Sequence, residues 1–317
     1  MRRWVTIAAA LLLAMSARSR AHTIIADSVA DWGVSSAQGY NGWYYGYYDG
    51  TSAFPYTNNP GGDDFNLMTQ FNPTTTDFQW WHQNGSGGYY TMVGQGIQHP
   101  NGTQANHAGR LPALEYSVRR WVSDYAGPID IEGHISMGGG QQAWNGVSGY
   151  ILVDGVQIYD QRVLSGNQTG FDYEVCRWID VGTVIDFVVD PGPLLMGSWN
   201  DLFDTTKFTA LITEMVPGDA NHDHAVDGLD YIVWADNFGA STTDGHDAGD
   251  FNCDGVVDGL DYVIWADNFG FGSAALPHDS FSVAAVPEPA TWSLALIGLV
   301  GLSAAGFFRR RTMRSRA

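Results

Sequence analysis

Alternation of apolar and polar positions, the two-residue period of a β-strand, dominates the first two thirds of the chain. The clearest case is a hairpin, in which runs at 150–153 and 156–159 flank Asp154-Gly155, a pair that favours a type I′ turn. Further alternating or apolar runs lie at 115–122, 129–135, 171–179, 184–189 and 208–212. No amphipathic helix interrupts them, so we predict a mainly β domain over residues 22–215, a two-sheet sandwich of about eight strands with jelly-roll topology.

A second pattern follows this domain, where residues 219–239 recur at 250–270, an offset of 31. Each copy joins a polar segment to an apolar run, at 229–238 or 260–269, that can form a short helix. A glycine follows each run as a helix stop signal. We therefore predict a small α domain at residues 216–272 with two loop–helix units.

The two polar segments have the spacing of a 12-residue calcium loop, with oxygen-bearing side chains at positions 1, 3, 5, 9 and 12 and a backbone carbonyl at position 7. The predicted ligands are Asp219, Asn221, Asp223, Ala225, Asp227 and Asp230 in the first loop, and Asp250, Asn252, Asp254, Val256, Asp258 and Asp261 in the second. Calcium takes about six to eight oxygens in irregular geometry, and clustered carboxylates repel one another without a cation. We therefore expect two calcium ions, bound in a step coupled to folding.

Two positions within these loops carry further expectations. Position 6 favours a positive φ, and it is Gly255 in the second loop but His224 in the first, so we expect the first site to bind more weakly. Position 8 is Val226 or Val257, and we expect these apolar residues to pair the two loops back to back.

A duplicated loop-then-helix unit with Asp rather than Glu at position 12 resembles the type I dockerin domain. The resemblance implies two calcium ions and, in the family, docking onto a cohesin module. Gly228-Leu229 and Gly259-Leu260 depart from it, because cohesin-binding dockerins often carry small hydroxyl residues there. No basic residue follows either helix before Arg309. A cohesin partner is therefore implied by the family alone, whereas the calcium ligands are all present.

The N-terminus has the composition of an export signal. Arginines at positions 2 and 3 precede an apolar run at 4–15, too short to span a bilayer, and small residues end at Ser19-Arg20-Ala21. We predict a signal peptide at residues 1–21, with cleavage after Ala17 as the alternative.

The C-terminus has the order of a membrane-sorting signal. After a linker at 273–285, Pro287, Glu288 and Pro289 precede an uncharged stretch at 290–308 and then an arginine cluster. As a helix this stretch spans roughly 28 Å, close to the ~30 Å of bilayer hydrocarbon, and arginines stay on the cytoplasmic side. Residues 286–317 resemble the PEP-CTERM sorting signal of Gram-negative bacteria. The resemblance implies an exosortase-type sorting protease and delivery to the cell surface; a plain transmembrane anchor is the alternative.

Charge excludes one class of partner. The chain carries 34 acidic residues against 15 basic ones, and only six of the basic residues lie between residues 22 and 308. A body this acidic repels nucleic acid and attracts cations.

Aromatic residues are the candidate ligand contacts of the β domain. Segments at 117–122, 127–133, 153–159, 184–191 and 204–209 resemble jelly-roll modules of exported bacterial surface proteins, which implies glycan binding. The candidate contacts are Trp43, Tyr44, Tyr47, Trp80 and Trp81. The glycine-spaced rings at 40–48 are too dense for alternation to bury them all, so we expect some to be exposed and able to stack on sugar; core packing is the alternative.

No catalytic residue is assigned from the sequence. Glu115, Asp124, Glu132 and Glu174 could supply a carboxylate pair of the glycosidase type, whereas His99, His107 and His134 lack metal-ligand spacing. Cys176 and Cys253 leave two alternatives open, an interdomain disulfide formed after export or a small core residue at Cys176.

The sequence as a whole predicts an exported, envelope-sorted calcium-binding surface protein whose sandwich binds polysaccharide or extracellular matrix. One alternative is a hydrolase acting on glycosidic bonds, or its cellulosome-like accessory subunit docking to a cohesin. Another is a calcium-stiffened spacer without a ligand.

Overall fold

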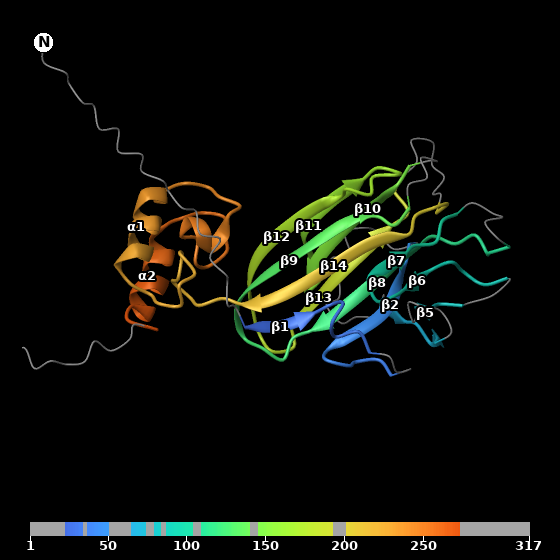
Figure 1. Ribbon diagram of the computed structural model, residues 1–317, viewed down its shortest axis with the longest axis horizontal. Helices are drawn as coiled ribbons and strands as arrows, with labels where there is room; N and C mark the ends of the chain where they lie inside the picture. Colours follow the sequence, from blue (N-terminus) through green and yellow to red (C-terminus); the bar gives the residue numbers. More distant parts are fainter. Residues whose placement is uncertain are drawn as a thin grey trace, which may run out of the picture. The chain divides into compact units, whose positions relative to one another are not determined.

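The computed structural model describes residues 23–33, 37–50, 65–73, 79–83, 87–103, 109–139, 145–192 and 201–272 (Figure 1). The predicted signal peptide at 1–21, the linker at 273–285 and the sorting segment at 286–317, with its apolar stretch at 290–308, lie outside these residues. Among the helices that the structure describes, none is long and apolar enough to cross a membrane.

The first sheet has the strand order β12-β9-β14-β7-β6-β5-β4, and β1 pairs with β14 outside this path. Its strands are β1 (Ile24–Asp27), β4 (Gln70–Asn72), β5 (Gln79–Trp81), β6 (Met92–Val93), β7 (Ile97–His99), β9 (Gly127–Met137), β12 (Phe171–Ile179) and β14 (Thr206–Glu214). Each pair in it is antiparallel.

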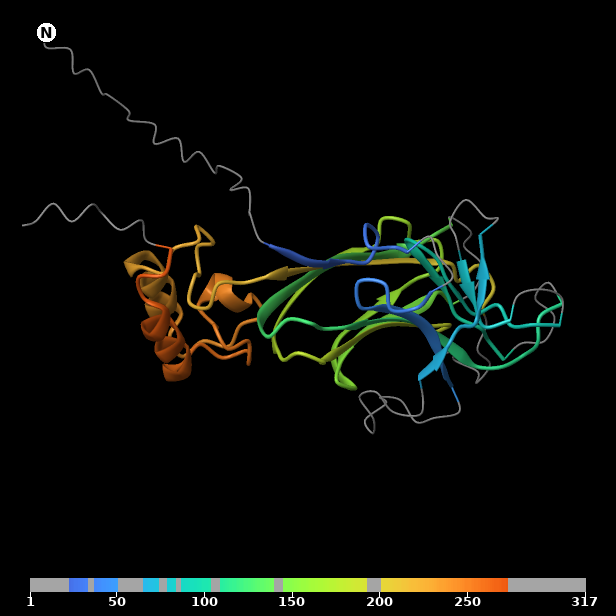
Figure 2. The same cartoon turned by 90° about the horizontal axis from the view of Figure 1, so that it is seen from below.

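The second sheet has the order β11-β10-β13-β8-β2-β3, again antiparallel. Its strands are β2 (Trp43–Asp49), β3 (Phe65–Leu67), β8 (Glu115–Val122), β10 (Val147–Val153), β11 (Val156–Val163) and β13 (Val184–Asp190). The two sheets form two layers (Figure 2). The predicted mainly β fold with two sheets is therefore confirmed.

The predicted number of about eight strands was too low, because the described residues contain fourteen. The predicted runs at 115–122 and 171–179 coincide with β8 and β12, and the others lie within β9, β13 and β14. The additional strands are mostly two to four residues long. Alternation cannot be recognised over so few positions, since strand detection needs about four to eight residues.

The predicted hairpin is confirmed between β10 and β11. Asp154 and Gly155 have φ values of 49° and 78°, so both turn residues are left-handed, as a type I′ turn requires. Aspartate tolerates this conformation better than most residues and glycine adopts it freely.

The main core lies between the two sheets. Trp43, Trp121 and Phe187 enter it from the second sheet, and Ile131 and Phe208 enter it from the first, each with at most 2% of its surface exposed. Phe187 and Phe208 meet edge to face with ring centroids 5.7 Å apart, so the rings of opposite sheets interlock.

Two adjacent arginines of β8 are buried on opposite faces of the second sheet. Arg119 has no exposed surface, and its guanidinium donates to the carbonyls of Gly94 and Gln95 at 2.7 and 3.1 Å. Burial lowers the pKa of Arg119 to about 10. Arg120 instead forms a bidentate pair with Asp186, at 2.7 and 2.8 Å.

Two short helices form within residues 216–272. α1 spans Gly228–Asn237 and α2 spans Gly259–Asn268, each within one residue of its predicted run. Both begin with a capping box, in which Asp227 or Asp258 is the N-cap. A 3₁₀ turn, η1 (Gly245–Ala248), lies between them.

The backbones of Val226 and Val257, which were expected to pair the two loops back to back, bond to the segment that follows the other copy's helix. Each valine is fully buried, but Val226 bonds to the backbone of Gly270 and Phe271, and Val257 to that of Gly239 and Ala240. The reason is that Gly239 and Gly270, with φ of 83° and 93°, turn the chain back after each helix, across the other loop. The two units therefore exchange contacts reciprocally.

Cys176 of β12 and Cys253 of the second loop form a disulfide, with their Cα atoms 5.7 Å apart. Of the two alternatives that the sequence left open for these cysteines, the structure therefore shows the interdomain disulfide. The Arg177 guanidinium adds a hydrogen bond of 3.0 Å to the carbonyl of Cys253. The second loop is thus linked covalently to the edge strand of the first sheet.

Candidate functional site

The first predicted calcium loop folds around its own carboxylates. Asp219, at position 1, accepts hydrogen bonds from the backbone N–H groups of Asp223 and His224, at 3.2 and 2.9 Å. Asp230, at position 12, accepts from Ala220 and Asp227, at 2.9 and 2.8 Å. These bonds turn the carboxylates from both ends of the loop towards its centre.

The second loop repeats this arrangement. Asp250 accepts from Asp254 and Gly255 at 3.1 and 2.8 Å, and Asp261 accepts from Asn252 and Asp258 at 3.1 and 2.8 Å. Two segments that share their oxygen positions thus share their backbone geometry as well.

Position 6 has the predicted conformation in both loops. Gly255 has a φ of 87°, and His224 adopts a φ of 64°, in the left-handed region that histidine enters less readily than glycine. Position 4 is also left-handed, at His222 (56°) and Cys253 (59°). The structure therefore keeps the loop shape in the first copy at the cost of backbone strain.

The first and last carboxylates of each loop are buried, whereas those at position 5 are exposed. Asp219 and Asp250 are 3% and 2% exposed, and Asp230 and Asp261 are fully buried. Burial raises the pKa of Asp230, Asp250 and Asp261, and a neighbouring aspartate adds to the shift in each case. The side-chain donors are all oxygens, which is the chemistry that a hard divalent cation takes.

Three of the five predicted glycan contacts lie in the interior. Trp43 is completely buried between the sheets, and Trp80 and Trp81 are 2% and 7% exposed. Their prediction as exposed sugar contacts was wrong, because Trp43 on β2 faces the core, where its ring lies 6.0 Å from that of Phe187. A substitution at Trp43 would therefore disturb the packing of the core and would not report on sugar binding.

The expectation that some rings of the 40–48 segment remain accessible is confirmed. Tyr40 is 53% exposed, and Tyr44 and Tyr47 are half-buried. Alternation on β2 sends Trp43 and Tyr45 into the core, so only part of the rings in this segment stays accessible.

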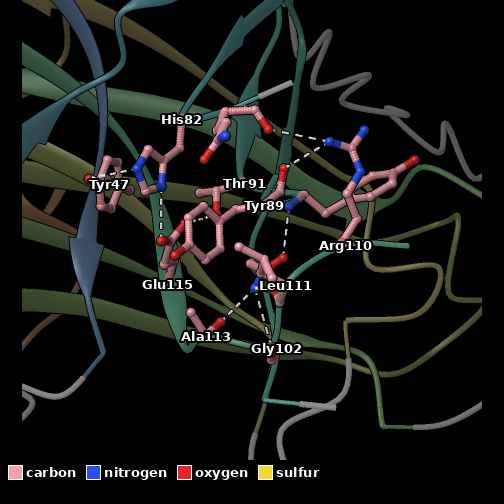
Figure 3. Close-up of polar contacts among 12 residues, drawn as sticks. Tyr47, His82, Tyr89, Thr91, Gly102, Arg110, Leu111, Ala113 and Glu115 are labelled. Atoms are coloured by element: carbon pink, nitrogen blue, oxygen red, sulfur yellow. Dashed lines mark hydrogen bonds and ion pairs between the residues drawn. The ribbon is translucent and has the colours of Figure 1, made fainter. Parts of the chain in front are cut away.

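Tyr47 belongs to a cluster that three distant segments build (Figure 3). The His82 ring is stacked between Tyr47 and Tyr89, with centroids 4.1 and 4.6 Å away and interplanar angles of 18° and 6°. His82 Nε2 lies 3.1 Å from the Tyr47 hydroxyl, and Nδ1 lies 2.9 Å from a carboxylate oxygen of Glu115. The Thr91 hydroxyl donates to the other oxygen of Glu115. We call Tyr47, His82, Tyr89, Thr91 and Glu115 the ring cluster.

The ring cluster fixes a partly exposed imidazole on a buried carboxylate. The side chain of Glu115 is 6% exposed, whereas that of His82 is 25% exposed. Burial raises the pKa of Tyr47, and the charge of Glu115 raises it further. Both Glu115 oxygens are engaged, so this carboxylate positions His82. The arrangement can present flat rings and oriented polar edges to a ligand.

Neighbouring residues hold the Tyr89 segment in place. Arg110 lies over the rings of Trp81 and Tyr90, 5.1 Å from each centroid, and donates to the Tyr89 carbonyl at 3.2 Å. Asn101 accepts from the Tyr90 N–H at 2.7 Å. The sequence offered a signal for His82, which follows Trp80-Trp81, and for Tyr89, which adjoins Tyr90, but none for Arg110 or Asn101.

Of the four carboxylates that could form a glycosidase-type pair, the structure brings two together. Asp124 lies exposed after β8, and Glu115 lies in the ring cluster. Glu132 of β9 and Glu174 of β12 stand directly opposite each other across the strand pair. His134 pairs with Asp172 at 2.7 Å, His99 bonds to the Pro100 carbonyl, and His107 lies outside the described residues.

Residues 285–311 match the protein family described as PEP-CTERM protein-sorting motif. The match contains Pro287, Glu288 and Pro289, as predicted, and lies outside the described residues. This signal indicates an exported protein that is sorted to the cell envelope. No curated protein sequence matches the chain.

Several solved structures are similar to parts of this chain. One is CBM51 from Clostridium perfringens GH95 in complex with methyl-galactose, at 14% identity over 41% of this chain and 77% of that chain, with a TM-score of 0.24. Another is CBM35 from Paenibacillus barcinonensis, at 12% identity over 42% and 87%, with a TM-score of 0.23. A third is a family 35 carbohydrate binding module from Clostridium thermocellum, at 10% identity over 41% and 84%, with a TM-score of 0.22. TM-scores this low establish neither a ligand nor an activity for this chain.

Proposed function

We propose that this chain is an exported, envelope-sorted surface protein whose jelly-roll sandwich binds polysaccharide at the ring cluster. The observation that carries the proposal is the stack of Tyr47, His82 and Tyr89, held half-buried by a buried carboxylate. Sugars present C–H faces that stack on flat rings, while polar groups nearby orient their hydroxyls. The ring cluster combines both features at one place.

We further propose that residues 216–272 bind two calcium ions, one in each 12-residue loop. Support comes from the duplicated all-oxygen donor set and from the matching hydrogen bonds around Asp219 and Asp250. The ions would be held by the ligands named from the sequence and would neutralise carboxylates that the loops bury together. This is the property that the resemblance to type I dockerins implies.

A cohesin-like protein is the proposed partner of this domain. Both helices, together with the C-cap residue of each, leave large apolar side chains exposed at matching positions. They are Leu229, Ile232 and Phe238 in one copy and Leu260, Val263 and Phe269 in the other, each at least 51% exposed. Exposed apolar surface of this extent is typical of an interaction site.

Removal of the tail is expected at the cell surface. We propose that an exosortase-type protease recognises Pro287-Glu288-Pro289 together with the apolar stretch at 290–308 and the arginines after it. Mass spectrometry of envelope-derived protein should then detect peptides up to the motif and none from 290–317. Intact tail peptides in the mature surface form would instead mean a plain membrane anchor.

Tyr89→Ala should weaken polysaccharide binding about fivefold, because one stacked ring contributes roughly 1 kcal/mol. Affinity electrophoresis against a panel of polysaccharides measures the effect. Trp178→Ala is the matched control, since Trp178 is a 47% exposed ring on β12, in a different part of the sandwich, and its loss should leave binding unchanged.

Two outcomes would contradict the glycan proposal. If the chain binds no polysaccharide of the panel, the calcium-stiffened spacer takes its place. If it releases reducing ends from one, the chain is a hydrolase acting on glycosidic bonds.

A further inference from the structure

We propose a third cation site, for one calcium ion, on the outer face of the first sheet. It is formed by Asp130, Glu132 and Glu174, which we call the carboxylate cluster. One oxygen from each of these residues lies within 4.8 Å of the other two. The site is separate from both 12-residue loops and from the ring cluster, and it does not depend on the functions proposed for them.

Strand register explains how the three side chains come together. Glu132 of β9 pairs with Glu174 of β12, and Asp130 pairs with Cys176 in the adjacent row. Asp130 and Glu132 are two residues apart and therefore share a face. The intervening Ile131 points into the core between the sheets, so the cluster lies on the opposite face.

The spacing of the oxygens fits a single ion. Calcium binds oxygens at about 2.3–2.6 Å, so two oxygens on one ion lie at most about 5 Å apart. The 4.8 Å limit within the cluster meets this condition without rearrangement of the strands. Three carboxylates at such distances repel one another, and a divalent cation removes that repulsion.

A buried hydroxyl provides an independent observation. Thr213 of β14 stands directly opposite Asp130 across the strand pair, on the same face of the sheet. Thr213 is 5% exposed, and its Oγ1 finds no hydrogen-bond partner among the residues that the structure describes. A buried hydroxyl without a partner is unfavourable, and a neutral oxygen beside carboxylates is a ligand that calcium accepts.

There is room for an ion with its water. Asp130 and Glu174 line a cavity of about 280 Å³, which Asp244, His246 and Asp247 line from the segment between the two repeats. Asp130 is only 2% exposed, so its charge is largely removed from bulk water. Water molecules in the cavity would complete the roughly six to eight ligands that calcium takes. The ion would lie beside Cys176, where the disulfide links the sheet to the second loop.

The test is a calcium count on the full chain by equilibrium dialysis. We expect three ions per chain in the wild type and two in Glu174→Gln and in Glu132→Gln. Asp172→Asn is the matched control, because Asp172 lies in the next row on the same face and pairs with His134, so it should keep three. A variant that combines Asp254→Ala with Glu174→Gln should bind one ion.

The count also separates this site from the loops. An ion that persists in Asp223→Ala with Asp254→Ala, and that disappears when Glu174→Gln is added, supports the cluster even if the loops bind nothing. A wild-type chain that binds no ion beyond those lost in the loop variants overturns the proposal. An unchanged count in Glu174→Gln overturns it as well.

Thermal unfolding gives a second readout that a merely structural glutamate would not produce. In chelator, Glu174→Gln should unfold a few degrees above the wild type, because one repelling charge is gone. Added calcium should then raise the midpoint less in this variant than in Asp172→Asn. Equal calcium responses in the two variants contradict the site.

Discussion

Chelation of calcium is expected to abolish most of the helical circular dichroism of residues 216–272. Each helix has only ten residues, and isolated helices of that length are marginal in water. Few of their side chains are fully buried, since Asp230 is the single buried residue of α1 and Asp261 that of α2, and the helices meet through partly exposed rings such as Tyr231 and Trp265, with centroids 5.2 Å apart. Each helix is capped by its N-terminal loop, and under the proposed calcium binding a cation would hold the carboxylates of that loop together.

The expected magnitude follows from linkage. An ion present at about a hundred times its dissociation constant stabilises the folded state by about 2.7 kcal/mol, so two sites contribute about 5 kcal/mol. Far-ultraviolet circular dichroism of the full chain, recorded with calcium and with chelator, measures the change. The β-sheet signal should persist, since the core between the sheets contains none of the loop ligands.

Single substitutions divide this effect between the loops. Asp254→Ala should abolish the second site and Asp223→Ala the first, whereas Asp267→Asn, which removes a charge from α2 outside the loop, should change neither. The first site should bind calcium more weakly, because the φ of 64° strains the backbone of His224, whereas glycine at position 255 adopts its φ of 87° without strain. Calorimetry that shows tighter calcium binding at the first loop would contradict the predicted order of affinities. Calorimetry that shows no calcium binding would contradict both sites.

Asp186→Ala is expected to destabilise the sandwich by about 3–5 kcal/mol. Asp186 accepts two hydrogen bonds from Arg120 and a third, of 2.6 Å, from the Tyr48 hydroxyl. The side chains of Arg120 and Asp186 are 8% and 2% exposed, so alanine leaves a buried guanidinium without its countercharge. Denaturant unfolding of the full chain in the presence of calcium measures the loss.

A combined variant distinguishes the cost of an unpaired buried charge at Arg120 from the cost of disturbed packing around the Arg120–Asp186 pair. Replacing all three polar groups at once, as Arg120→Met, Asp186→Leu and Tyr48→Phe, removes the charges without leaving one unpaired, and stability should return to within about 1 kcal/mol of the wild type. If Asp186→Ala alone costs less than about 1 kcal/mol, the pair is more hydrated than its burial indicates.

Much of the fold could be predicted because the signals are local. The Asp154-Gly155 turn requires two left-handed residues, and the sequence supplies two that tolerate this conformation. β8 and β12 were found to the residue because eight or nine alternating positions suffice to define a strand. The short strands β3 to β7 could not be found, since two or three residues are too few to show an alternation of apolar and polar positions. Such strands form only when neighbouring strands offer hydrogen bonds.

The candidate loops were predictable for the same local reason. Ligand spacing and a following helix lie within about twenty residues in each copy, so Asp219 and Asp230 converge through hydrogen bonds with backbone groups of their own loop. The partners of Val226 and Val257 were not predictable, because they come from the segment beyond the other helix.

By itself, the sequence determined the C-terminal sorting motif, the duplicated oxygen-rich loops and the β character of the first domain, because each depends on residues close together in the chain. Only the tertiary structure decided which rings are accessible, since Trp43 and Tyr47 lie on the same face of β2, yet Trp43 is fully buried and Tyr47 is only half-buried. It alone joined Cys176 to Cys253 and placed Glu132 opposite Glu174. Such pairs depend on strand register, which is fixed by burial of the whole sheet and leaves no trace in local spacing.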